Sequence, residues 1–244
     1  MPTTKKRFAF ITGANKGIGL EVARQLGHLE HLILLGARDI TLGETAAARL
    51  KAAGIEVRFV HIDLSKPETI HAAATTIDAD YGRLDVLVNN AAIVDSADGP
   101  PSTAAIGAVR RIFDTNFFGT LTVVQAMLPL LRKSTCGRIV NLSSGLGSLT
   151  LNSDPNWEFA PYKFLGYNAS KAALNMLTVQ LAAELKDSGI KVNSANPGFT
   201  ATDLNHHSGT QTIAQGAVAA IRLAVLPDDG PTGGFFSASG EEPW

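Results

Sequence analysis

The stretch that decides the fold is Phe8-Ala9-Phe10-Ile11-Thr12-Gly13-Ala14-Asn15-Lys16-Gly17-Ile18-Gly19. It opens with a short apolar run, and apolar positions with helical spacing follow its last glycine. A buried strand, a glycine turn and a helix N-terminus in this order form a phosphate site. Backbone N–H groups point outward there, the helix dipole is positive, and the missing side chains allow close approach. The stretch therefore predicts dinucleotide binding, with a purely structural turn as the alternative. The predicted contacts are Gly13, Asn15, Lys16, Gly17, Ile18 and Gly19.

The alternation of apolar strand and helix continues along the rest of the chain. Further strands are expected at residues 32–35, 57–60, 85–88, 138–142, 190–193 and 234–236. Helices are expected at residues 41–53 with Thr41 as N-cap, from Pro67 onward, at 105–131, around Tyr167 up to 187, and at 210–225. This pattern predicts one α/β domain, a doubly wound parallel sheet of about seven strands with helices on both faces in three layers. Its ligand crevice is expected at the carboxyl ends of the strands.

Composition narrows the class of protein. The 244 residues are 45% hydrophobic and 18% charged, which is ordinary for a globular chain and long enough for a full core. The formal net charge is −1 and the charges form no basic block, so neither nucleic acid nor an anionic membrane is an expected partner. A single cysteine, Cys136, excludes an internal disulfide and a multi-cysteine metal site, and no metal is expected. The apolar run after the basic residues 1–7 is too short for a signal peptide or membrane span, which favours the cytoplasm.

The type of dinucleotide can be predicted from the residues after the second strand. A carboxylate there usually accepts from the ribose 2′-hydroxyl of NAD, whereas a cation suits the 2′-phosphate of NADP. Arg38 occupies this position and Lys16 is a second cation, which favours NADP(H) over NAD(H). Both cations could instead be solvated surface residues, and Asp39 could pair with Arg38 or accept from a ribose. Asp63-Leu64, just past the third strand, is placed to meet the adenine edge.

Tyr167 and Lys171 form the candidate catalytic pair. They are four residues apart, so on a helix both side chains project from one face. A phenol normally loses its proton at about pH 10, and an ammonium one turn away favours the phenolate. Such a pair can exchange a proton at neutral pH. The same spacing also occurs on solvated helix faces, so the assignment depends on the motifs around it.

The chain resembles the short-chain dehydrogenases/reductases, especially the carbonyl-reductase-like members, over nearly its whole length. The resemblance implies a Rossmann-type fold and NADPH-dependent reduction of an aldehyde or ketone, reversible as alcohol oxidation. Ala92 stands where the family usually has glycine. The matching motifs are Thr12-Gly13-x-x-x-Gly17-x-Gly19, Asn89-Asn90-Ala91-Ala92, Asn116, Ser143-Ser144, Tyr167-x-x-x-Lys171 and Pro197-Gly198-Phe199-Thr200-Ala201-Thr202.

The resemblance also implies the roles of individual residues. Ser144 would donate a hydrogen bond to the substrate oxygen, and Tyr167 would give that oxygen its proton. Lys171 would bind the ribose hydroxyls of the nicotinamide half and lower the pKa of the phenol. Asn116 would hold a water that links Lys171 to solvent, and Asn89 would shape the strand end beside the ribose. Further cofactor contacts are expected from Asn90, Ala91, Pro197, Gly198, Thr200 and Thr202.

Other residues with reactive side chains are weighed against this set. Tyr162 has Gly166 rather than a lysine four residues on, so it is expected to be a pocket wall or ordinary packing. The adjacent pair His206-His207 is expected on the surface rather than as a base or metal pair. Cys136, between a helix end and a strand, is expected to be a small bland residue.

An insertion separates the serine from the tyrosine. Ser144 and Tyr167 are 23 positions apart, more than in ordinary family members, and residues 149–163 are expected to form an inserted loop or short helix. Carbonyl-reductase-like relatives carry an insert here near a helix used for dimer packing, so monomer, dimer and tetramer all stay open. Trp157, Phe159 and Phe164 could line an apolar substrate pocket or cover the core.

The substrate itself is left open by the sequence. Residues 97–101 and 203–212 are further candidate rims of the substrate site. A dedicated steroid, sugar or other metabolite dehydrogenase and a non-catalytic NADP(H)-binding regulator are the alternative functions. The regulator is disfavoured, because the serine, the tyrosine and the lysine are all present.

Overall fold

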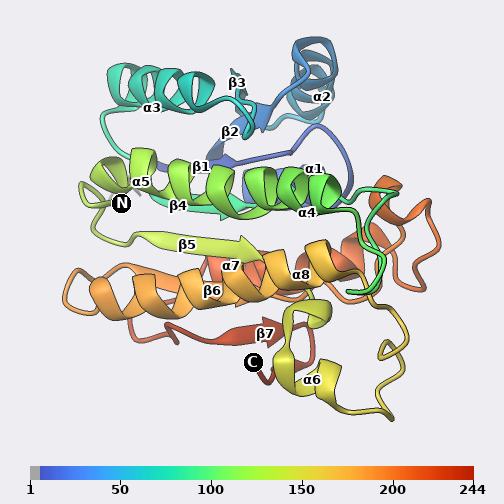
Figure 1. Cartoon of the computed structure of the whole chain (residues 1–244). Helices are drawn as coiled ribbons and strands as arrows, with labels where there is room; N and C mark the ends of the chain where they lie inside the picture. The colour runs from blue at the N-terminus through green and yellow to red at the C-terminus, as the bar shows by residue number, and fades with distance from the viewer. Residues whose placement is uncertain (1–5) are drawn as a thin grey trace.

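The computed structural model describes residues 6–244, so residues 1–5, most of the basic start of the chain, lie outside it. One sheet forms its centre. The strands are β1 (Arg7–Ile11), β2 (His31–Ala37), β3 (Val57–His61), β4 (Val86–Asn89), β5 (Arg138–Leu142), β6 (Lys191–Ala195), β7 (Phe235–Ser237) and β8 (Gly240–Glu241). Their order in the sheet is β3-β2-β1-β4-β5-β6-β7-β8 (Figure 1). Seven strands are parallel, as predicted, and the short β8 adds an antiparallel edge that was not predicted.

Helices cover both faces of this sheet. The helices are α1 (Gly17–His28), α2 (Ile40–Ala52), α3 (Pro67–Tyr81), α4 (Ile106–Phe113), α5 (Thr120–Leu131), α6 (Leu149–Ser153), α7 (Leu165–Glu184) and α8 (Ile213–Ala224). Three tighter or wider turns complete the set: the π-helix η1 (Asp114–Gly119) and the 3₁₀ helices η2 (Gly145–Gly147) and η3 (Asp203–Asn205).

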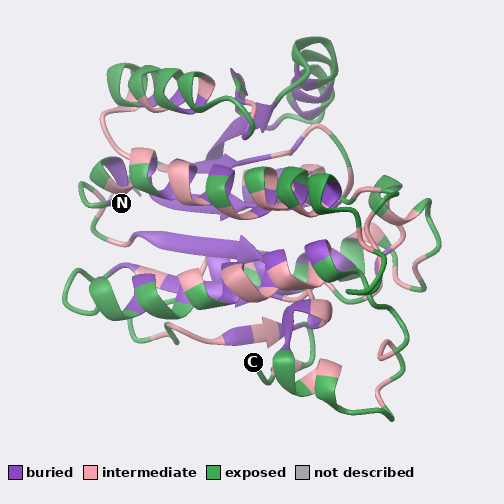
Figure 2. Ribbon diagram, in the orientation of Figure 1, coloured by how far each residue is buried: buried purple, intermediate pink, exposed green. Residues whose placement is uncertain are grey.

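The core consists of two apolar layers, one on each side of the sheet. Apolar residues of α1, α2 and α8 pack on one face, and those of α3, α5 and α7 pack on the other. All seven residues of β2 are buried, as expected for a parallel strand covered on both sides. Figure 2 shows buried strands at the centre and helices whose outer surfaces are exposed. The predicted doubly wound, three-layer fold is therefore confirmed.

Two helix predictions were wrong in detail. The helix expected at residues 105–131 is interrupted by η1, a widened turn that hydrophobic periodicity does not reveal. The helix expected from Thr41 begins at Ile40, and its N-cap is Asp39, whose carboxylate accepts from the Leu42 N–H at 2.9 Å. An aspartate is the stronger cap because its carboxylate also complements the helix dipole.

The order of the strands determines where a ligand can enter. The chain runs outward from β1 through β2 to β3 and then returns to place β4 on the other side of β1. At such a reversal, neighbouring loops leave the sheet in opposite directions and open a crevice at the carboxyl ends of the strands. The glycine turn after β1 and residues 90–92 after β4 both lie at this edge.

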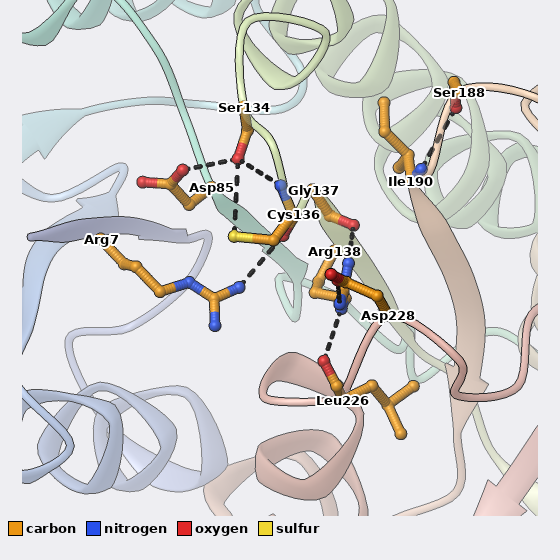
Figure 3. A network of polar contacts seen from close by, with 10 residues as sticks. All are labelled: Arg7, Asp85, Ser134, Cys136, Gly137, Arg138, Ser188, Ile190, Leu226 and Asp228. Atoms are coloured by element: carbon orange, nitrogen blue, oxygen red, sulfur yellow. Dashed lines mark hydrogen bonds and ion pairs between the residues drawn. The ribbon is translucent and has the colours of Figure 1, made fainter. Parts of the chain in front are cut away.

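At the other end of the strands, where they begin, a polar network links the loops (Figure 3). Asp85, buried at the start of β4, accepts from the Phe8 N–H at 2.8 Å and from the Ser134 hydroxyl at 2.6 Å. Arg138 is 1% exposed and pairs with Asp228 at 2.7 Å. Cys136 contributes a backbone carbonyl that accepts from Arg7 at 3.1 Å, and its sulfur contacts only a serine hydroxyl in this network. Within residues 6–244, no helix has both the length and the hydropathy needed to cross a bilayer.

Candidate active site

A cleft of about 700 Å³ opens at the carboxyl ends of the strands. It contains most of the residues predicted to bind a cofactor, although they come from distant parts of the chain. The lining includes Gly13, Asn15, Lys16, Gly17, Ile18, Arg38, Asp63, Leu64, Asn90, Ala91, Tyr167, Lys171, Pro197 and Thr202. The predicted residues outside this lining are Gly19, Asn116, Ser144, Gly198 and Thr200.

The glycine turn brings backbone close to the floor of the cleft. Gly13 and Gly17 have φ values of 63° and 58°, in the left-handed region that favours glycine. A Cβ on Gly13 would lie 2.9 Å from Cα of Ala91, so a side chain there would push β1 and β4 apart. Among the described residues, no side chain caps the start of α1, which leaves its first N–H groups available to an anion. This end of the cleft therefore fits the phosphates of a dinucleotide.

Asn90 supports the turn rather than only lining it. Its side-chain amide donates to the carbonyl oxygens of Thr12 and Gly13 at 2.8 and 3.0 Å. In return, the Thr12 hydroxyl accepts from the N–H groups of Asn90 and Ala91, both at 3.1 Å. These bonds join the loops after β1 and β4. Thr12 thus supports the glycine turn, a role that its place in the sequence motif did not predict.

The cations expected at the 2′-phosphate differ in their surroundings. Arg38 is exposed and lines the cleft, while Asp39 is engaged as the cap of α2. Lys16 instead forms an ion pair with Asp203 at 2.6 Å, and this contact holds the pKa of the Asp203 carboxyl below its ordinary value. The other carboxylate oxygen of Asp203 lies 2.8 Å from Nε2 of His207.

The two adjacent histidines lie at the mouth of the cleft. His206 and His207 are exposed, as predicted, and both line the cleft. Their φ values of 53° and 59° put both residues in the left-handed region. Asp203 pairs with both His207 and Lys16, so it connects this rim to the glycine turn. Lys16 and Asp203 are 187 positions apart in the chain.

The candidate catalytic residues come together where β5 meets α7. Tyr167 and Lys171 both lie on α7, and the Lys171 nitrogen is 5.7 Å from the centre of the tyrosine ring. Lys171 is buried and donates to the Leu142 carbonyl at the end of β5 at 2.7 Å. Ser144 is the second residue after β5, and its side chain lies close enough to the phenol of Tyr167 to lower the pKa of that group. The Ser144 oxygen also accepts from the Leu146 N–H at 3.2 Å.

Burial shifts both titrating groups of this pair. Desolvation raises the pKa of Tyr167 to about 12, and the hydrogen bond from Ser144 offsets this in part. Burial also lowers the pKa of Lys171 to about 8. Loss of water therefore dominates the pKa of the phenol, and the lowering expected from the lysine stays a prediction. At neutral pH the phenol is protonated and the lysine is mostly charged.

Asn116 is bound by protein groups on both sides of its amide. It lies in η1, and its oxygen accepts from the Ile93 N–H at 2.8 Å. Its nitrogen donates to the Ile93 carbonyl at 3.0 Å and to the Ser170 hydroxyl at 3.1 Å. Both amide hydrogens are thereby engaged, so the side chain joins the loop after β4 to α7. These bonds do not test the water link expected from Asn116, which stays a prediction.

The turn after β6 forms the remaining wall. Gly198 has a φ of 67°, and the Thr200 hydroxyl donates back to the Pro197 carbonyl at 2.8 Å. Thr200 also forms an isolated parallel bridge with Gln211, which closes the segment between them into a loop. Thr202 is the N-cap residue of η3, and its N–H donates to the side-chain oxygen of Asn205 at 3.1 Å.

The insertion forms an aromatic cluster beside the serine. After the short α6, Trp157 and Phe159 lie 5.4 Å apart, and Phe159 is 5.5 Å from Phe199 of the turn after β6. Tyr162 joins Phe159 at 6.0 Å and is 43% exposed. These rings belong to neither of the two core layers, and they are not among the residues that line the cleft. A Cβ on Gly145 would lie 3.1 Å from the indole of Trp157, which puts this cluster next to Ser144.

Several lining residues were missed by the sequence reasoning. They include Arg111, Asp114 and Thr115 from the end of α4 and the start of η1. The widened turn of η1 presents these side chains to the cleft, and an uninterrupted helical period gives no signal for it. Asp203 was named only as the start of a candidate rim, although it lines the cleft directly.

Comparison with known proteins gives a consistent result. The profile of the short chain dehydrogenase family matches residues 7–212. A (+)-neomenthol dehydrogenase of Capsicum annuum is 30% identical over 305 residues, covering 96% of this chain and 96% of the relative. The NADPH-dependent carbonyl reductase 1 of Mus musculus is 31% identical over 281 residues, covering 99% of this chain and 100% of the relative.

Solved structures agree with this match. The salutaridine reductase of Papaver somniferum superposes with a TM-score of 0.81 at 29% identity, covering 95% of this chain and 99% of the other. The NADPH-bound carbonyl reductase from chicken fatty liver has a TM-score of 0.84 at 26% identity, covering 98% of this chain and 100% of the other.

Proposed function

Because the chain belongs to the short-chain dehydrogenase family, as a carbonyl-reductase-like member acting on alcohol and carbonyl groups, we propose that it reduces an aldehyde or ketone with NADPH. The observation that carries this proposal is the meeting of two features in one cleft. Tyr167 and Lys171 face the same space as the glycine turn. A proton donor and a dinucleotide seat are thus adjacent, as reduction of a carbonyl requires.

The cofactor seat is assigned to the chain's own groups. The first turn of α1 and the glycine turn receive the phosphates, and Arg38 at the end of β2 receives the 2′-phosphate. Asp63 and Leu64 meet the adenine edge, while Pro197 and Thr202 meet the nicotinamide half. NADPH, when bound, supplies the hydride. Lys16 reaches the phosphates only by exchanging its Asp203 partner.

The proton step follows from the burial of the tyrosine. A pKa of about 12 keeps the phenol protonated at neutral pH, so Tyr167 acts as the acid toward the substrate oxygen. Ser144 donates a hydrogen bond to the same oxygen as negative charge builds on it. Lys171, charged below its pKa of about 8, stabilises the phenolate that forms and contacts the ribose hydroxyls.

The substrate is proposed to be largely apolar. The aromatic cluster contains Trp157, Phe159 and Phe199, and Trp157 lies against Gly145, the residue after Ser144, so it supports an apolar wall of the substrate site. The similarity to a neomenthol dehydrogenase and a salutaridine reductase supports a cyclic ketone as the first substrate class to test.

The decisive test removes only the phenolic hydroxyl. Tyr167→Phe is expected to lower kcat by at least about a thousand-fold, since the general acid is lost, while NADPH affinity changes little. Turnover is measured as loss of NADPH absorbance against a panel of aldehydes, diketones, quinones and bulky ketones. NADPH affinity is measured by fluorescence titration. The panel also separates a dedicated metabolite dehydrogenase from a broad carbonyl reductase.

Tyr162→Phe is the matched control, because it removes the same group from a partly exposed ring of the insertion. Wild-type turnover is expected in this variant. Full activity of Tyr167→Phe would overturn the proposed function. Binding of NADPH without turnover of any compound by the wild type would favour the regulator.

A further inference from the structure

Asp98 lies between β4 and α4, yet it is bonded to the helix that carries the tyrosine. Its Oδ1 accepts from the Gly166 N–H at 2.8 Å, and its Oδ2 accepts from the Tyr167 N–H at 2.9 Å. The neighbouring Gly99 carbonyl accepts from the Leu165 N–H at 2.8 Å. Two consecutive residues thereby satisfy the first three N–H groups of α7, although they lie far earlier in the chain.

The helix has no cap of its own at this end. The N-cap position is held by Phe164, whose side chain makes no capping hydrogen bond. A helix start without such a partner leaves several N–H groups unsatisfied and frays. The carboxylate of Asp98 supplies the missing acceptors and complements the positive end of the helix dipole. One of its bonds is to the backbone of Tyr167 itself.

The local sequence of α7 is compatible with this contact only because residue 166 is small. A Cβ on Gly166 would lie 3.2 Å from each carboxylate oxygen of Asp98 and 3.0 Å from Cδ1 of Ile112. A larger side chain would push the carboxylate away from the helix. Gly166 thus allows the loop and α4 to approach the first turn of α7 closely.

The loop that carries Asp98 is itself braced. Asp95 receives two hydrogen bonds from the Arg111 guanidinium, at 2.9 and 2.7 Å. The Asp95 carbonyl accepts from the Asp98 N–H, and the Ala97 carbonyl accepts from the Ala105 N–H, both at 3.0 Å. Asp98 is therefore held by α4 on one side and holds α7 on the other.

We propose that Asp98 is a positioning residue for the reaction, which holds the first turn of α7 so that the Tyr167 hydroxyl stays aligned with the substrate oxygen. The inference rests on the proposed role of Tyr167 as the acid. A displacement of about 1 Å in a reacting group can cost on the order of a hundred-fold in rate. The glycine turn is joined to β4 and not to α7, so cofactor binding is expected to be largely independent of Asp98.

The test compares Asp98→Asn and Asp98→Ala with Asp80→Asn, which removes the same charge from an exposed aspartate near the end of α3, outside this loop. An asparagine keeps one acceptor oxygen, whereas alanine keeps none, so a graded loss of kcat is expected. We expect roughly ten-fold for Asp98→Asn and more for Asp98→Ala, with NADPH affinity within about two-fold of wild type. The solvent deuterium isotope effect on kcat is expected to rise, because proton transfer becomes rate-limiting. Asp80→Asn is expected to keep the wild-type kcat and isotope effect.

A purely structural cap would lower the thermal midpoint and leave kcat and the isotope effect unchanged in folded protein. That result for both Asp98 variants would overturn the inference. Gly166→Ala offers a second route to the same outcome, with the carboxylate intact but displaced, and is expected to lower kcat in the same way. If Tyr167→Phe were fully active, the proposed function would fail first. If Tyr167→Phe were inactive and all Asp98 variants were normal, only this inference would fail.

Discussion

At the scale of single residues, chemistry in the cleft depends on how much water each group loses. Lys171 is buried and directed at the Leu142 carbonyl, and Tyr167 has a raised pKa. A spacing of four residues on a helix indicates that the two side chains are neighbours. It does not indicate how well each is solvated. Burial raises the pKa of Tyr167, a direction that the spacing alone does not indicate.

The choice of cofactor is a second question at this scale. Arg38→Ala is expected to weaken NADPH binding by about ten- to a hundred-fold and NADH binding little, because a charged hydrogen bond to phosphate contributes about 1.5–3 kcal/mol. Fluorescence titration with both nucleotides measures the difference. Arg58→Ala is the control, since Arg58 is an exposed arginine on β3 that pairs with Asp80 at 3.6 Å. Equal losses for NADPH and NADH in Arg38→Ala would contradict the 2′-phosphate assignment.

At the scale of secondary structure, the interrupted helix before β5 is the clearest departure from the predicted pattern. The period of apolar residues indicates a continuous helix, because a π-turn adds one residue without changing composition. The wider turn η1 turns Asn116 toward Ile93 and Ser170. Tertiary bonds of this kind compensate for the poorer geometry of the turn.

The start of α2 gives a prediction at the same scale. Asp39→Ala is expected to lower the free energy of unfolding by about 1 kcal/mol, because the Leu42 N–H loses its acceptor. Thr41→Ala is expected to change it by less than about 0.5 kcal/mol, since Thr41 is an exposed residue inside the helix. Urea denaturation measures both. A larger effect of Thr41→Ala would restore the cap first expected from the sequence.

At the scale of the whole molecule, the carboxyl ends and the amino ends of the strands differ in what they hold. The cleft lies at the carboxyl ends. At the amino ends, Arg7, Asp85 and Arg138 each form hydrogen bonds with neighbouring groups (Figure 3). His31, the first residue of β2, also lies at the amino ends of the strands. Its Nδ1 lies 3.2 and 3.0 Å from the carbonyl oxygens of Leu26 and Leu29, and burial lowers its pKa below 6.5.

This histidine makes stability depend on pH. Below pH 6.5 the unfolded chain protonates His31 while the folded chain resists, so the unfolded state binds more protons and stability falls as pH decreases. The stabilisation is fully present above pH 6.5 and is lost as pH falls from there toward the folded pKa. His31→Gln is expected to lose less stability than wild type between neutral and mildly acidic pH, measured by urea denaturation. His71→Gln, at an exposed position, serves as control, and identical pH dependence in wild type and His31→Gln would contradict this account.

The sequence by itself determined the fold class, the glycine turn, the Tyr167-Lys171 pair and most of the residues around the cleft. These features rest on local periodicity, on the short-range conformational freedom of glycine and on spacing within one helix. Only the tertiary structure decided that Lys16 pairs with Asp203, that Asp98 caps α7, and that burial raises the pKa of Tyr167. Those bonds join segments 187 and 69 positions apart, and the burial depends on everything packed around the site. Their geometry is set by strand order and register, which no single stretch of the chain contains.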